Sequence, residues 1–228
     1  MSKTLSRLAV LAAFHLGLAQ LVLADGTDAI IPYKTMDDLC QVASAVDQTK
    51  LLVRVFVSSQ NKAVHPSDIS LTIQSSAKGM IPVQVGTNGQ ILNFPHEKEL
   101  SRENPSIIAN QPKGTLGLSI STQIVLPEAL TFHYERLGDG VAEANKAIKA
   151  QAGMLLSLLA PKAQGVVFCF PKASAGKASV VIASSAGKQA FTADEKGRVK
   201  LKLEKNLLSE NPEVQLSEKP QVVVPDIE

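Results

Sequence analysis

The hydrophobic residues of this chain follow two periods, one typical of β-strands and one typical of α-helices. Strand-like alternation or continuous runs of β-forming residues occur at 51–57, 69–73, 81–85, 91–94, 115–124, 166–170, 180–182, 199–203 and 221–224. Helix-like steps of three and four residues occur at 33–50 and 139–159. The chain is therefore predicted to be α+β and mostly β.

The two predicted helices carry different end signals. At 33–50, Thr35 can cap the helix, and Asp37 and Asp38 follow in the first turn, where the helix dipole favours negative charge. The helix at 139–159 has the clearer apolar stripe, although two glycines weaken its start. We expect this stripe to pack on its own sheet, and docking on another protein is the alternative.

A short sequence recurs about half a chain apart, as Leu-Ser-Arg-Glu-Asn-Pro at 100–105 and Leu-Leu-Ser-Glu-Asn-Pro at 207–212. Around it the predicted elements recur in one order, and Tyr33 and Tyr134 precede the two helices at the same relative place. The sequence therefore predicts two tandem repeated units, each a helix followed by a small antiparallel β-sandwich-like sheet. Their expected bounds are residues 25–128 and 129–228.

The N-terminus has the pattern of a secretory signal peptide over residues 1–24. Lys3 and Arg7 form a positive start, an apolar run follows, and Ala24 ends a cleavage signal before Asp25. An uncleaved anchor helix is the alternative, but the apolar run is short for a membrane span. The mature chain is expected to be soluble, to have no stable membrane span, and to be periplasmic or secreted.

The composition narrows the classes of partner. Aromatic residues make up only 4% of the chain and Trp is absent, which disfavours stacking platforms for bases or sugars. Without Lys3 and Arg7, 21 basic residues remain against 21 acidic ones, so the mature chain is formally neutral. Nucleic acid is therefore not an expected partner, because phosphate neutralisation supplies most of that affinity.

A turn near the C-terminus resembles a known module. Thr192, Asp194, Gly197 and Val199 resemble the Thr-x-Asp-x-x-Gly-x-apolar turn of prealbumin-like and Ig-like β-sandwich modules, which occur beside carboxypeptidases and in many exported proteins of Gram-negative bacteria. The matching stretch of the first unit, residues 85–91, is shorter and lacks the aspartate. The resemblance implies a non-catalytic binding or spacer module.

Cys40 and Cys169 are the only cysteines, one in each predicted unit. An even number of cysteines in an exported protein makes them a candidate disulfide. Closing a loop of more than 100 residues would contribute roughly 4 to 5 kcal/mol in the chain-entropy model. The alternative is two buried free thiols, since both residues lie among apolar neighbours in sequence.

Candidate catalytic and metal residues do not form a recognised pattern. His65, His96 and His133 lack the spacing of a zinc site, and His133-x-Glu135 lacks the cysteine pair of a zinc deaminase. Nucleophile-elbow and phosphate-loop motifs are absent from the sequence. We therefore predict no catalytic, cofactor-binding or metal residues and no cofactor.

These observations favour a non-enzymatic binding, adaptor or assembly role in the cell envelope, with another envelope protein as partner. Exposed sheet edges could pair with a partner strand. One alternative is an envelope hydrolase with a site between the two units, which would require His133, Glu135 and the turn at 65–68 to come together. A second alternative is an inhibitor or chaperone of another exported protein.

Overall fold

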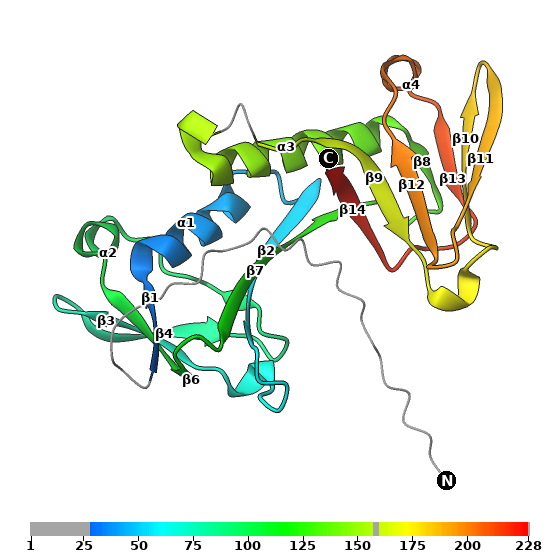
Figure 1. The fold of residues 1–228 in the computed structure, drawn as a ribbon. Coiled ribbons are helices and arrows are strands. Elements are labelled where there is room, and N and C mark those ends of the chain that lie inside the picture. The colour runs from blue at the N-terminus through cyan, green and yellow to red at the C-terminus, as the bar shows by residue number, and fades with distance from the viewer. Residues whose placement is uncertain (1–27, 157–159, 228) are drawn as a thin grey trace, which may run out of the picture.

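The computed structural model describes residues 28–156 and 160–227 (Figure 1). The chain is mostly β, with 43% strand and 24% helix, which confirms the mostly β character of the predicted class. The predicted signal peptide and the last three residues of the predicted second helix lie outside the described residues. In the described part, no helix combines the length and the apolar character that a membrane span requires.

The described helices and strands divide into two halves with the same number of elements. The first half contains, in order, β1 (Asp28–Pro32), α1 (Tyr33–Ser44), β2 (Leu51–Ser59), η1 (Pro66–Asp68), β3 (Leu71–Ser75), β4 (Gly79–Val85), β5 (Ile91–Leu92), α2 (Lys98–Glu103), β6 (Ser106–Pro112) and β7 (Leu116–Ile124). The second half contains β8 (Thr131–His133), α3 (Glu135–Leu156), β9 (Ala163–Cys169), η2 (Lys172–Ser174), β10 (Ser179–Ser184), β11 (Gly187–Thr192), β12 (Arg198–Lys202), α4 (Lys205–Glu210), β13 (Glu213–Leu216) and β14 (Val222–Ile227).

The strand pairing is similar in both halves except at β5 and β12, and every pair described below is antiparallel. In the first half β1-β6-β3-β4-β5 form one sheet and β2-β7 a second one. In the second half β8-β13-β10-β11 and β12-β9-β14 form two sheets. The neighbours β1-β6-β3-β4 thus correspond to β8-β13-β10-β11, and β2-β7 corresponds to β9-β14.

The end of α1 differs from the prediction. Ser44 is its last residue, six positions before the predicted end at residue 50, because Asp47 turns the chain. The Asp47 carboxylate accepts hydrogen bonds from the backbone N–H of Thr49 at 2.9 Å and from its hydroxyl at 2.7 Å. Such a local side-chain bond competes with helix continuation. Thr35 lies inside α1 and is not its cap.

The helix caps come from far along the chain. The side-chain oxygen of Asn104 accepts the N–H of Lys34 at 2.8 Å, and that of Asn211 accepts the N–H of Glu135 at 2.8 Å. Each asparagine ends a short helix, α2 or α4, in the left-handed conformation, with φ of 50° and 54°. The repeated Asn-Pro is therefore a corner that ends one helix and caps the start of another.

Each corner also holds a buried tyrosine. The N–H of Tyr33 donates to the carbonyl of Pro105, and that of Tyr134 to Pro212, both at 2.9 Å. Each phenolic oxygen accepts a backbone N–H at 3.2 Å, from Glu97 and Glu204 respectively. Both tyrosines are 0% exposed, so the corner fixes the start of each long helix against its core.

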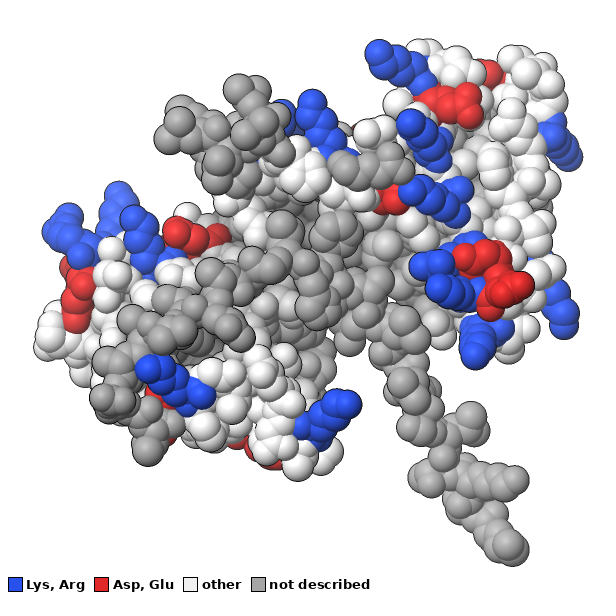
Figure 2. Space-filling view, in the orientation of Figure 1, with Lys and Arg blue, Asp and Glu red and all other residues white. Residues whose placement is uncertain are grey.

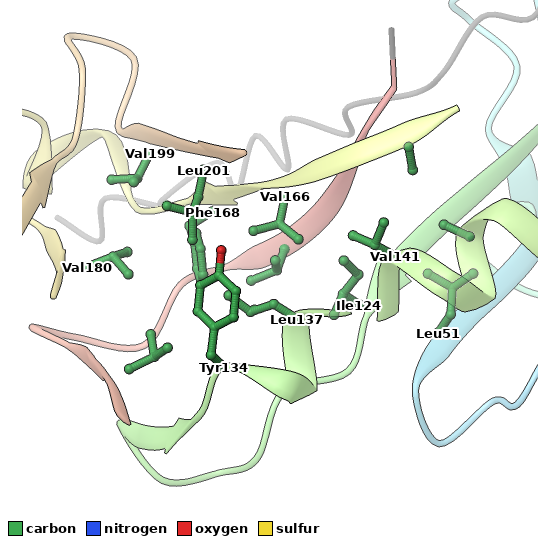
Figure 3. Close-up of a cluster of buried hydrophobic side chains, with 14 of the residues drawn as sticks. Leu51, Ile124, Tyr134, Leu137, Val141, Val166, Phe168, Val180, Val199 and Leu201 are labelled. Carbon is green, nitrogen blue, oxygen red and sulfur yellow. The ribbon is translucent and has the colours of Figure 1, made fainter. Parts of the chain in front are cut away.

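Two hydrophobic cores form, and the larger one extends across both halves. The smaller core lies within the first half, around Tyr33, Met36 and Ile73. The larger core surrounds Tyr134 and Phe168 (Figure 3). First-half side chains that belong to it are Val42, Val46, Leu51, Val53 and Ile124. The predicted boundary at residue 128 stays a prediction, and the two halves bury apolar side chains against each other.

Polar contacts of α3 also join the halves. The guanidinium Nε of Arg136 donates to the carbonyl of Val125 at 2.8 Å, and Lys50 lies 2.9 Å from Asp139. Glu143, which is 5% exposed, accepts the backbone N–H of Asp47 at 2.9 Å. Of the apolar stripe of α3, Leu137, Val141 and Ala144 belong to the larger core, as expected for packing on its own protein.

Stability should fall on acidification partly through Glu143. Its carboxylate has a lowered pKa, mainly because of the Lys146 ammonium and secondly because of the Asp47 N–H. A carboxylate with a lowered pKa in the folded protein stabilises fully above its unfolded value of about 4.3, and this stabilisation is lost as the pH falls through the folded value. Glu143→Gln should therefore lose less stability than the wild type between about pH 6 and about pH 3.

Denaturant unfolding of the two proteins at each pH measures this difference. Other carboxylates titrate in both proteins, so only the difference between the two slopes reports Glu143. Parallel slopes would show that Glu143 has no lowered pKa in the folded protein.

Candidate functional site

The most open element of the described structure is the edge strand β11. It pairs with β10 from Ser179–Thr192 to Ser184–Gly187, and no other described strand pairs with its outer side. All its side chains are exposed except that of Phe191, which is half-buried against the larger core. An open edge presents unpaired backbone N–H and C=O groups, which are the groups that a further strand would bind.

The corresponding edge in the first half is occupied at one end only. There β4 pairs with β3 on one side and with β5 on the other, through Gln84–Leu92 and Val85–Ile91. In the second half the equivalent of β5 is β12, which pairs along its whole length with β9. A two-residue strand thus lies beside the end of β4, while no described strand lies beside β11.

The alternation in β12 explains this difference. Val199 and Leu201 are 2% and 3% exposed and pack in the larger core, while the intervening basic residues face outward. This amphipathic strand is therefore held against β9 over five residues. In the first half only Ile91 is similarly buried, and the short β5 turns toward β4.

A proline also distinguishes the two edges. Pro82 lies opposite Thr72 in β3, and Ala190 lies opposite Val181 in β10. Each faces the residue between the two fully buried side chains of the inner strand, so the positions are equivalent. Pro82 has no N–H to offer a further strand and so blunts the edge of β4. Ala190 keeps its N–H, so β11 lacks this protection.

Charge differs between the two hairpins as well. Lys78, at the β3–β4 turn, forms ion pairs with Glu97 and Glu99, which raise the pKa of its ammonium. Lys188 in β11 is exposed and has no ion pair among the described residues. In Figure 2 the surface over β10 and β11 is mostly uncharged, with isolated basic side chains.

A buried polar cluster in the first half was not predicted from the sequence. Asp37 is 2% exposed and lies 2.6 Å from the imidazole Nδ1 of His96. It also accepts hydrogen bonds from Ser101 Oγ at 3.0 Å and Gln41 Nε2 at 2.8 Å. The serine hydroxyl thus bonds to the carboxylate and not to the imidazole, which differs from the Ser–His contact of a nucleophilic triad.

The second half shows that the fold does not require this cluster. Counted from the tyrosine and asparagine of each corner, the places of Asp37 and Ser101 are taken by Gly138 and Leu208. A Cβ on Gly138 would lie 2.5 Å from the Leu208 side chain, so apolar packing fills that space. Asp37, which the sequence predicts as an acid in the first turn of the helix, is therefore a buried hydrogen-bond acceptor.

The residues of the hydrolase alternative lie on exposed surface in separate halves. His133 contacts the Asn211 carbonyl at 3.3 Å, and the N–H of His65 donates to Asp68 within its own turn at 3.3 Å. Among the described residues, no group of three or more His, Cys, Asp or Glu side chains could hold a metal ion.

Both cysteines are free thiols in the structure. Cys40 is buried in α1, where burial raises its pKa to about 12, and Cys169 is half-buried in β9, where burial also raises its pKa. Thiols with raised pKa values are poor nucleophiles at neutral pH. The disulfide between them stays a prediction.

A shallow groove of about 200 Å³ lies between the halves. The linker at 125–130 forms one side and residues 216–223 form the other, with a Glu128–Lys219 ion pair at its rim. Its lining is largely apolar, and its charged groups, Glu128 and Lys219, pair with each other.

Comparisons of the chain with protein-family models, with curated proteins and with solved structures found no match.

Proposed function

We propose that the protein is an exported cell-envelope protein, periplasmic or secreted, with a non-enzymatic binding, adaptor or assembly role that it performs by taking up a partner strand at β11. The observation that carries this proposal is the open edge of β11, which pairs on one side only and lacks the proline that blunts the matching edge of β4. Strand addition draws affinity from main-chain hydrogen bonds and specificity from alternate side chains. The pattern of residues 1–24 supports export.

The proposal includes two tandem units that are copies of one ancestral module. Matched contacts support it, since the N–H of Val57 donates to the Gly89 carbonyl at 2.8 Å and that of Phe170 donates to the Gly197 carbonyl at 2.7 Å. The corners at Asn104 and Asn211 match equally well. In such a pair of copies one unit can keep its edge blunted by a proline while the other evolves to bind.

Ala190→Pro is the variant that tests the binding edge. It copies Pro82, which β4 tolerates while still pairing with β3, so the hairpin should keep its fold. The substitution removes one N–H donor and adds a ring to the edge, and strand addition should be lost. We expect the wild-type protein to capture a partner from an envelope extract and Ala190→Pro to lose that capture.

Ala190→Ser is the matched control, because it changes the side chain and keeps the N–H. Thermal unfolding of both variants checks that the hairpin persists. Equal capture by Ala190→Pro and Ala190→Ser would show that the edge of β11 is not the binding surface.

A further inference from the structure

We infer that the segment taken up by β11 is an acidic extended stretch of another protein, an inference that rests on the binding function proposed above. The argument begins with the lysine of the hairpin. In the first half Lys78 is neutralised by Glu97 and Glu99 of the same chain. In the second half the positions equivalent to Glu97 and Glu99 are Glu204 and Asn206, and Lys188 forms no ion pair with Glu204 or another described carboxylate.

Cationic side chains lie at both ends of the β11 edge. Lys188 is the second residue of β11, next to the hairpin turn. At the other end, the N–H of Gly176 donates to the carbonyl of Ala193, which places the loop holding exposed Lys172 and Lys177 beside the end of β11. Neither of these two lysines has an ion pair among the described residues.

No described carboxylate forms an ion pair with Lys188, and of the two acids that follow β11, Asp194 pairs with Arg198 and Glu195 is exposed. Glu210 accepts the backbone N–H of Ser185 at the hairpin turn. Glu213 shares a cross-strand row with Ala183 and Lys188, two strands away from the lysine. Two strand spacings amount to about 10 Å, roughly the screening length at physiological salt. A partner carboxylate beside β11 would approach Lys188 more closely than Glu213 does.

A second copy of this chain fits the edge less well. In an antiparallel pair of two β11 strands, Lys188 of one copy would lie near Lys177 of the other. This contact between like charges would occur at both ends of the pair. Like charges placed opposite each other in a sheet are destabilising. An acidic segment reverses the sign of the same contacts.

The inner face of the edge defines the other half of the partner's pattern. Gln189 and Phe191 lie opposite the buried residues Ile182 and Val180, so a strand added beside β11 would direct alternate residues toward this apolar side. In the first half the added strand places Ile91 there, at 8% exposure. The expected partner segment therefore alternates apolar and acidic residues.

Two capped peptides test the inference, one alternating Val with Glu and the other alternating Val with Lys. At low salt we expect the Glu peptide to bind the mature protein at least about tenfold more tightly than the Lys peptide, with amide shifts centred on β11. Lys188→Glu should reduce this preference or reverse it. Raising the salt from about 0.01 M to about 0.5 M should shrink the preference, because exposed charges are screened.

The outcomes separate the two proposals. Equal binding of both peptides, lost in Ala190→Pro, would overturn the acidic partner and keep the binding edge. Binding of neither peptide in a protein that also does not self-associate, or binding that survives Ala190→Pro, would overturn both. Self-association that Ala190→Pro abolishes, without peptide binding, would assign the edge to a second copy and so overturn the acidic partner.

Discussion

Gly89→Ala should lower the free energy of unfolding by about 2 to 5 kcal/mol, the largest single effect that we expect in this protein. Gly89 has φ of +85°, where a side chain costs about 1 to 2 kcal/mol. A Cβ there would also lie 2.3 Å from the Val57 carbonyl oxygen, which is backbone and cannot rotate away. The turn that contains Gly89 would have to move away from β2 and break the hydrogen bond from the Val57 N–H to the Gly89 carbonyl. Denaturant unfolding measures the loss.

Gly114→Ala is a control for the conformational part of this effect. Gly114 has φ of +78°, but no atom lies within 4 Å of its Cβ position. Its replacement should cost only about 1 to 2 kcal/mol. Equal losses at the two glycines would show that the close approach to Val57 has no energetic consequence.

Asn211→Ala should lower the free energy of unfolding by about 2 to 3 kcal/mol, the second-largest effect. Two losses add, because alanine is strained at φ of 54° and cannot accept the N–H of Glu135 at the start of α3. Asn211→Gly separates them, since glycine adopts this conformation freely and removes only the cap. The glycine variant should lose about 0.5 to 2 kcal/mol.

Asn104 provides an internal comparison, since it caps α1 in the same way. We expect Asn104→Ala to lower the free energy of unfolding more than Asn104→Gly, as at Asn211. A glycine variant as unstable as the alanine variant would assign the whole effect to the lost hydrogen bond. A fully stable alanine variant would show that neither the cap nor the left-handed turn matters.

Local pattern predicted the strands that carry their own alternation. β2 lies where a run of β-forming residues indicates a strand, and β12 lies where alternation does, because half their side chains enter a core. β1, β6, β8, β11 and β13 were not predicted, since they depend on pairing with other strands. The repeated Asn-Pro was rightly predicted as a turn, but its capping role was not visible, because its target lies 70 residues or more away along the chain.

The candidate binding edge was equally hidden from sequence reasoning. β11 has no clear alternation, and its significance comes from what lies beside β4 in the other half. Likewise, Asp37 looked like a first-turn acid at a helix start, and its contact with His96 joins residues 59 positions apart. Signals of this kind arise from tertiary pairing and are absent from any short window of sequence.

The core that crosses both halves has a consequence for synthesis of the chain. Val42, Leu51 and Ile124 are synthesised with the first half. Other residues of the same core, such as Tyr134 and Phe168, are synthesised later. At about 5 to 20 residues per second, the remaining hundred or so residues take about 5 to 20 s to emerge. During that interval the first half presents an uncovered apolar surface to chaperones and to its neighbours. The order of synthesis thus makes the N-terminal half the aggregation-prone one.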